Sequence, residues 1–187
     1  MESSVKSNKL TDKELVAKII RTKESVLFAE LYDRYAHIIY NKSLSFVKTK
    51  VEAEDITHDI FLKLYLKLYM YKGKSKFSTW LYSFTYNYCV NYVERNLKKR
   101  KEKVKDADFD ENSSVEITDE EFFQLKSDKL KKALTMISAN DKMILLLKYQ
   151  DDLSIKELES VLNIGKSAVK MRVKRAKEKV MNVYKKL

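Results

Sequence analysis

The sequence predicts an all-helical protein, with two small helical domains joined by a charged linker. The 187 residues include no proline and only two glycines, Gly73 and Gly165, whereas a β-rich fold needs turn residues about every eight to twelve positions. Hydrophobic residues make up 44% of the chain and recur at three- and four-residue steps, as expected of helices around a core. A charged stretch in the middle of the chain interrupts this pattern and separates two parts.

The first part predicts four helices. A short helix is expected after Thr11, because Thr11 and Glu14 have the Ser/Thr-x-x-Glu spacing of a capping box. Longer helices are expected over about residues 26–46 and about residues 52–69, each with one apolar stripe. A fourth helix begins near Ser78 and carries an aromatic-rich face. The lysine-rich segment before it predicts a loop.

The middle of the chain changes composition abruptly. Residues 95–105 hold seven basic residues and one acidic residue, and residues 106–121 hold eight acidic residues and no basic one. Such a segment has little to bury and is typical of a solvated linker, although the acidic half could also lie on a basic surface and compete with DNA. The expected organisation is an N-terminal segment with the short helix (1–24), a first domain (25–100), the linker (101–121) and a second domain (122–187).

The second part again has helical periodicity. A strongly apolar helix is expected around residues 143–147, followed by a second capping box at Ser154 and Glu157. A turn follows in which Asn163 or Gly165 can adopt positive φ. The last helix is expected to start near Lys166, with an apolar stripe facing the domain core: Val169, Val173, Ala176, Val180 and Val183.

Charge and residue content limit the function classes. The net charge of +11 favours a polyanionic partner, either nucleic acid or an anionic membrane surface. The single cysteine, Cys89, excludes an internal disulfide and a cysteine-based zinc site, and two histidines leave almost no material for a metal site. We therefore expect no cofactor, no metal, no catalytic residue and no small-molecule substrate. We also expect no membrane insertion and a cytoplasmic location, because neither a signal peptide nor an apolar run of spanning length is visible.

The residues from Ser154 to Val180 predict a helix-turn-helix. The second helix of this motif has one apolar face and one basic face, with seven basic residues against the single acidic residue Glu178. A helix of this kind fits the DNA major groove, where its first turns meet base edges and its flanks meet phosphates. A solvated amphipathic helix is the alternative, but the coincidence of cap, turn and basic helix favours DNA binding.

Several segments resemble sigma factors of the extracytoplasmic-function group within the sigma-70 family. Residues 152–158, 162–170 and 172–176 resemble region four of that family, although this motif alone is shared with other helix-turn-helix regulators. Three further segments resemble region two, in the same order and at fitting distances: Phe28–Tyr35, the acidic segment Glu54–Phe61, and the aromatic segment Phe77–Tyr82. The matches together cover most of the chain from Ser25 to Lys186.

This resemblance implies three sets of binding residues. For core RNA polymerase it implies Asp55, His58 and Asp59, although spacing alone favours an ordinary solvated face, and His58 replaces the glutamine common in the family. For the −10 element and its single strand it implies Lys72, Lys74, Ser75, Lys76, Trp80, Tyr82 and Tyr86, although the residue pattern alone favours core positions for Trp80, Phe84 and Tyr88. For duplex −35 DNA it implies Lys166, Ser167, Lys170, Met171, Arg172, Lys174, Arg175 and Lys177.

The expected function is that of an alternative sigma factor, which directs core RNA polymerase to specific promoters and helps to open them. The expected partners are core RNA polymerase, promoter DNA and an anti-sigma factor, the last implied only by the resemblance. The alternative is a helix-turn-helix transcriptional regulator that is not a sigma subunit, but no phosphoacceptor or ligand-binding domain is visible. A nucleic-acid-processing enzyme comes third, because the sequence has no acidic metal triad, Walker loop or Ser/Cys/His set.

Overall fold

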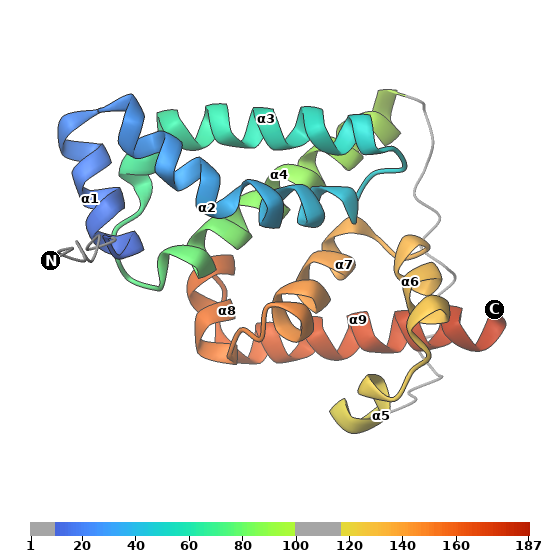
Figure 1. Cartoon of the computed structure of the whole chain (residues 1–187). Coiled ribbons are helices and arrows are strands. Elements are labelled where there is room, and N and C mark those ends of the chain that lie inside the picture. The colour runs from blue at the N-terminus through green and yellow to red at the C-terminus, as the bar shows by residue number, and fades with distance from the viewer. Residues whose placement is uncertain (1–9, 100–116) are drawn as a thin grey trace, which may run out of the picture.

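The computed structural model of the chain describes residues 10–99 and 117–187, and every regular element in these ranges is a helix (Figure 1). The predicted all-α fold class is confirmed. The first domain contains α1 (Asp12–Thr22), α2 (Ser25–Leu44), α3 (Lys50–Lys67), the 3₁₀ turn η1 (Leu68–Met70) and α4 (Phe77–Lys99). The second contains α5 (Asp119–Phe123), α6 (Ser127–Thr135), α7 (Ala139–Leu145), the π-helical turn η2 (Leu146–Gln150), α8 (Ile155–Leu162) and α9 (Lys166–Lys186). None of the described helices has the length and apolar character needed to cross a membrane.

Reciprocal caps fix where several helices begin. At the start of α1 the Glu14 amide donates to Thr11 Oγ1 at 3.3 Å, and the Thr11 amide donates to Glu14 Oε2 at 2.8 Å. The second predicted box, at the start of α8, is also formed. A cap of this kind contributes about 1 kcal/mol to helix stability. Two further boxes, which the sequence analysis did not predict, start α3 and α5: Thr49 with Glu52, and Thr118 with Glu121.

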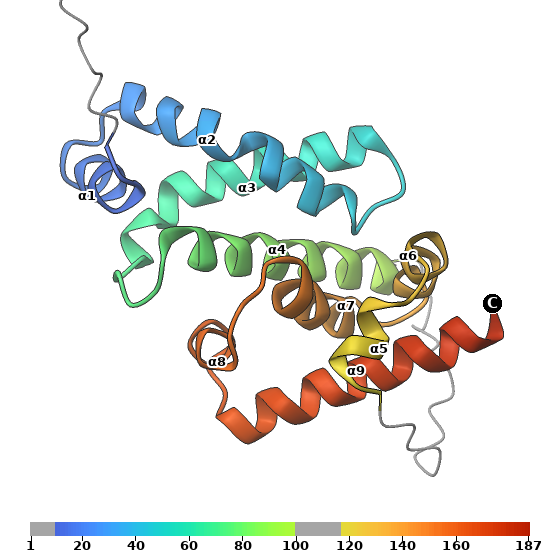
Figure 2. The same cartoon turned by 60° about the horizontal axis from the view of Figure 1, so that its bottom comes forward.

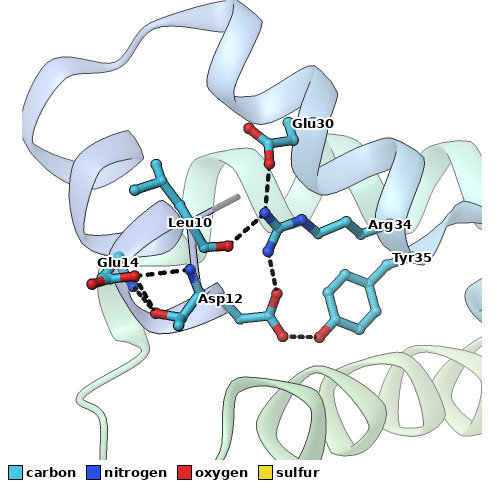
Figure 3. A network of polar contacts seen from close by, with 7 residues as sticks. Leu10, Asp12, Glu14, Glu30, Arg34 and Tyr35 are labelled. Carbon is cyan, nitrogen blue, oxygen red and sulfur yellow. Dashed lines mark hydrogen bonds and ion pairs between the residues drawn. The ribbon is translucent and has the colours of Figure 1, made fainter. Parts of the chain in front are cut away.

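A polar network fixes α1 against α2 (Figure 3). The Arg34 guanidinium donates to Asp12 Oδ1 at 2.7 Å and to the Leu10 carbonyl oxygen at 2.6 Å, and it also pairs with Glu30. The Tyr35 hydroxyl donates to the second oxygen of Asp12. Burial and this carboxylate raise the pKa of Tyr35, so its hydroxyl stays protonated and keeps donating. The network places α1 beside η1, at the base of the loop that follows.

The second domain is built around the apolar face of α9. The predicted stripe from Val169 to Val183 is buried, as expected from its three- and four-residue spacing. Asn163 adopts positive φ, at 52°, and closes the turn between α8 and α9, whereas Gly165 is extended at φ −70° and forms the N-cap of α9. Of the two candidates for the left-handed position, Asn163 therefore takes it.

The predicted linker is shorter than expected. Its residues up to 116 lie outside the described part of the chain, but Ile117 and Phe122 are buried in the second domain. The Phe122 ring packs on the Tyr149 ring at a centroid distance of 4.9 Å. Ile117 and the capping box at Thr118 therefore belong to the second domain, although they lie within the predicted linker, where the acidic composition concealed them.

The two domains pack directly against each other. Figure 2 shows α4 lying between α2 and α3 on one side and α7 and α8 on the other. Tyr86 and Val90 of α4 belong to the same buried cluster as the core residues of the second domain. The sequence predicted the two domains but gave no indication of this shared interface.

Candidate polymerase and nucleic-acid interfaces

The predicted acidic residues lie on an exposed face of α3. Asp55, His58 and Asp59 are exposed, while Ile56 and Ile60 between them face the core. Asp59 is tied to the next helix, since the Tyr88 hydroxyl donates to its Oδ2 at 2.7 Å. Burial of the Tyr88 ring and this bond raise the pKa of the phenol, so the hydroxyl remains a donor. The structure thus brings the three predicted residues together on one surface.

The same face continues with apolar residues that the sequence analysis missed. Leu62, Leu66 and Tyr69 are 67%, 70% and 61% exposed and follow Asp55 and Asp59 at alternating steps of four and three residues. That spacing places all five on one side of a helix and could have revealed them. Exposed apolar side chains gathered on one face indicate an interaction surface. We call these five residues the α3 face.

The loop before α4 presents three exposed lysines. Lys72, Lys74 and Lys76 are all exposed, and Gly73 takes the left-handed conformation at φ 70°. The Tyr71 hydroxyl donates to the Ser75 carbonyl oxygen at 2.7 Å and so closes the loop on itself. The lysines therefore project from a braced turn, which suits contact with a phosphate backbone.

Aromatic side chains support this loop and line a pocket beside it. Trp80 is half-buried and stacks on Phe84 with 5.5 Å between the ring centroids, and the Tyr71 ring centroid lies 5.6 Å from that of Trp80. The pocket has a volume of about 420 Å³ and is lined by the loop, by Trp80 and Phe84, and by Ser160 and Val161 of α8. Trp80 and Phe84 thus combine the roles of core and pocket wall, and a flat base could stack in such a site.

Two predicted members of the single-strand site do not belong to this surface. Tyr86 is fully buried, and Tyr82 is half-buried with the Lys42 ammonium 4.0 Å from its ring centroid. The expectation that Tyr86 faces outward was wrong. Residues 82 and 86 are one turn apart on the side of α4 that packs on α2 and the second domain, whereas residues 80, 84 and 88 follow another side.

A second groove along α4 contains polar residues that the sequence analysis did not single out. Asn87 and Asn91 are exposed and one turn apart, and they line a groove of about 430 Å³. Asparagine can form two hydrogen bonds with adenine, and lysine and arginine around it can contact phosphates. The Asn-x-x-x-Asn spacing was the available signal. The other lining residues are Lys63, Lys67, Phe84, Tyr88, Tyr92, Arg95, Asn96 and Lys99.

The first three turns of α9 carry most of the predicted duplex-binding residues. The exposed members are Lys166, Ser167, Lys170, Met171, Arg172 and Arg175. Lys174 is half-exposed, with its Nζ 4.0 Å from Glu178 Oε1. Because Val169 and Val173 face the core, these polar side chains are displayed on the outer side of the helix, as a major-groove helix requires.

Lys177 does not join this exposed set. It is 8% exposed, and its Nζ donates to the Ile117 carbonyl oxygen at 2.8 Å and to Asp119 Oδ1 at 2.7 Å. The hydrogen bond from Lys177 lowers the pKa of Asp119, with a second bond from Tyr149. The assignment of Lys177 to phosphate contact was wrong in this structure, because the partner that holds it lies in the segment assigned to the linker.

Comparison with known proteins identifies both domains. Residues 31–99 match the family model described as Sigma-70 region 2, and residues 127–180 match that described as Sigma-70, region 4. No curated protein sequence matches the chain closely enough to be called a relative.

Two solved structures share the fold. One is the sigma factor RpoE in complex with the anti-sigma factor NepR from Bartonella quintana, with 22% identity and a TM-score of 0.58, covering 84% of this chain and 96% of that one. The other is CnrH in complex with the cytosolic domain of CnrY, with 19% identity and a TM-score of 0.60, covering 91% of this chain and 95% of that one. With both regions matched in order and the fold shared, the chain belongs to the sigma-70 family of sigma factors, in its extracytoplasmic-function group.

Proposed function

We propose that this protein directs core RNA polymerase to a specific set of promoters and helps to open them. One observation carries the proposal: surfaces of different chemistry, each suited to one step of initiation, occur on the two sigma domains of one chain. These are the α3 face, the lysine loop with its aromatic pocket, and the exposed side of α9. The protein itself catalyses nothing, and the chemistry of RNA synthesis stays with the polymerase.

The α3 face is the proposed contact with core polymerase. Its two carboxylates would attract a basic surface, and Leu62, Leu66 and Tyr69 supply the apolar area that a stable interface buries at its centre. His58 is exposed on the same side of α3, next to the carboxylates, and would contact the same partner surface.

The loop and pocket at the start of α4 are the proposed single-strand site for the −10 element. Lys72, Lys74 and Lys76 would follow the phosphates, while Trp80 offers a stacking surface for an unpaired base. Asn87 and Asn91 extend this site toward duplex DNA, where amide side chains can distinguish adenine.

The outer side of α9 is the proposed reader of the −35 element. Lys170, Lys174 and Arg175 would meet base edges, and Arg172 would lie nearer the phosphates. A good bidentate pair discriminates between bases by about 1–3 kcal/mol, so single substitutions here are expected to change promoter preference.

The remaining partners follow from the family. One of the solved structures described above holds the sigma factor RpoE together with the anti-sigma factor NepR, and the other holds CnrH together with the cytosolic domain of CnrY. We infer that an anti-sigma factor also restrains this protein, and that the protein acts in the cytoplasm, where its polymerase and promoter partners are. Among the described residues no group of three His, Cys, Asp or Glu is arranged to hold a metal ion.

The test is transcription from a promoter library that carries randomised −35 and −10 elements. Core polymerase alone and core polymerase with the purified protein are compared, and the transcripts are sequenced. A sigma factor gives promoter-specific transcripts without any other specificity factor. A helix-turn-helix regulator of another kind gives none, although it would still retard duplex DNA. Replacing Lys72, Lys74 and Lys76 with Ala in the same assay should reduce strand opening, read by permanganate, and leave polymerase binding intact.

A further inference from the structure

The interface between the domains is continuous with both cores. Phe46, which follows α2, packs against the buried clusters of both domains. Polar contacts frame the apolar part: Asn140 Nδ2 donates to Glu94 Oε1 at 2.7 Å, and Ser83 Oγ donates to the Val161 carbonyl oxygen at 3.5 Å. These contacts connect α4 with α7 and α8, so the two domains form one closed body.

A buried ion pair crosses this interface. Lys42 of α2 is 4% exposed and pairs with Asp151, which follows η2 in the other domain and whose side chain is 5% exposed. The Lys42 ammonium also donates to the Tyr86 hydroxyl at 3.2 Å and lies over the Tyr82 ring. The second oxygen of Asp151 is buried without a hydrogen-bond partner. The pair is therefore tightly enclosed, and one of its carboxylate oxygens has no direct hydrogen bond from the protein.

A second lysine enters the interface from the opposite direction. Lys142 of α7 is 8% exposed, and its Nζ donates to the Ser45 carbonyl oxygen of the first domain. The Phe46 ring centroid lies 5.2 Å from the same nitrogen. Each domain thus inserts one ammonium group into the other, and separation of the domains would return both groups to water.

This closed form brings the two proposed DNA sites too close together. The pocket at the −10 loop is lined both by Lys72 and Lys74 and by Ser160 and Val161 of the helix-turn-helix. On a promoter, positions −35 and −10 lie about 25 base pairs apart, which is roughly 85 Å of B-form DNA. A domain pair in direct contact cannot hold both elements at once.

We propose that the Lys42–Asp151 pair is a latch that holds the free protein in this closed, self-inhibited form. Promoter recognition then requires the latch to open, and the stability of the closed form limits the activity of the free protein. This proposal rests on the proposed function only for its consequence, because the latch itself is a property of the free chain.

A buried ion pair that holds two domains together responds differently to single and to double substitution. Removing one partner leaves an uncompensated charge in the closed form but costs nothing in the open form, where water solvates the charge. Asp151→Ala and Lys42→Met should therefore each open the protein, although they alter different domains. Replacing both partners by apolar residues, as in Lys42→Met with Asp151→Leu, removes the buried charge and should restore closure, since such replacements are often neutral or stabilising.

Opening is measured on the full chain by fluorescence transfer between dyes at Val51→Cys and Asp128→Cys. Both sites are exposed, on α3 and α6, and native Cys89 is buried with its pKa raised to about 12, so it escapes labelling. Each single variant should lower transfer and increase the radius of gyration, shifting the open-to-closed ratio about tenfold or more, and the double variant should recover both values. Asp119→Ala, which breaks an ion pair inside the second domain, is the matched control and should change neither. Unchanged transfer in both folded single variants overturns the latch.

A second readout separates the latch from the proposed function. With limiting core polymerase, the single variants should give more promoter-specific transcript than the wild type, and the double variant should not. Equal yields from all these proteins, despite different transfer values, would overturn the inhibitory role. If no variant supports transcription, the proposed function fails, while the fluorescence result still decides whether Lys42 and Asp151 hold the domains together.

Discussion

Lys142 is an interface residue whose protonation depends on domain closure. Burial lowers its pKa to about 8 from the usual 10.5, against a smaller opposing effect of Cys89, whose own pKa is raised to about 12. Lys48 lines the same groove and adds a second positive charge near the site. In an open form water would solvate the ammonium again and return its pKa toward 10.5.

This difference predicts that closure depends on pH. Below about pH 8 the Lys142 ammonium is charged in both the closed and the open form, and burial of this charge opposes closure. Between about pH 8 and 10.5 Lys142 loses its proton in the closed form, where its pKa is lower, but keeps it in the open form. The closed form therefore becomes more favourable as the pH rises. The closed-to-open ratio should rise by up to roughly a hundredfold over this range. Fluorescence transfer between labelled domains measures it. Lys142→Met should flatten the profile, and an equally steep profile in that variant would assign the titration to another group.

Lys177 and Arg175 lie two residues apart on α9 and should behave differently when replaced. Lys177→Ala leaves the Ile117 carbonyl oxygen without this donor and the Asp119 carboxylate with only its bond from Tyr149, which should cost about 1–3 kcal/mol of stability and lower the melting temperature. Arg175→Ala should leave stability unchanged and shift base preference at one or two −35 positions. Thermal unfolding measures the change in stability, and the randomised-promoter assay measures the change in base preference. A Lys177→Ala protein with normal melting and uniformly weaker DNA binding would restore the phosphate role.

The sequence assigned residues correctly where their neighbours along the helix decide their environment. Val169 and Val173 were expected in the core, and they lie there, because the three- and four-residue rule is local. Lys177 and Tyr86 were misplaced because their partners, Asp119 and Lys42, are 58 and 44 residues away. A basic or aromatic side chain next to an apolar stripe can point toward the core or toward solvent. Only its partner in the tertiary structure determines which of the two occurs.

Helix starts were predictable for the same local reason. The boxes at Thr11 and Ser154 place the first residues of α1 and α8 at the positions that the sequence indicated. By contrast, η2 continues α7 as a π-helical turn, and it ends beside Asp152, which has positive φ at 53°. The amino-acid pattern gives no signal for this change of helical pitch, which directly precedes Asp151 of the interface.

At the scale of an element, the α3 face should bind polymerase as a unit. Changing Asp55 and Asp59 to Lys should weaken binding to core polymerase by about 2–5 kcal/mol, because two charges that face a basic surface become repulsive. The control changes Glu120 and Asp128 to Lys, which alters the net charge equally at exposed sites of the other domain. A pull-down with core polymerase compares the two folded variants. Equal binding would place the polymerase contact elsewhere.

At the scale of the whole molecule, the shared core predicts cooperative unfolding. Tyr86 and Val90 of the first domain are buried with residues of the second, so neither domain can unfold without exposing apolar surface of the other. Calorimetry of the wild-type chain should give one transition, and Asp151→Ala should split it into two or broaden it. Two separate transitions in the wild type would mean that closure adds little to the stability of either domain.

The number of domains and their order along the chain were predictable, whereas their contact was not. Within each domain apolar residues recur at helical spacing, and the charged stretch between the domains marks the division. The interface consists of a few residues each from α2 and the segment after it, α4, α7, α8 and the turn after η2, which are spread over more than a hundred positions of the chain. No short segment of the sequence contains enough of these residues to predict the interface.

The distance in sequence between Lys42 and Asp151 also has a consequence during synthesis. The two residues are 109 positions apart, and the first domain is complete at Lys99, so it can fold on the ribosome well before Asp151 has been made. At about 5–20 residues per second, the ribosome needs roughly 5–20 s to travel from one partner to the other. During the later part of that time a nascent chain has a complete −10 loop without Ser160 and Val161 of the second domain beside it, and only a finished protein can close.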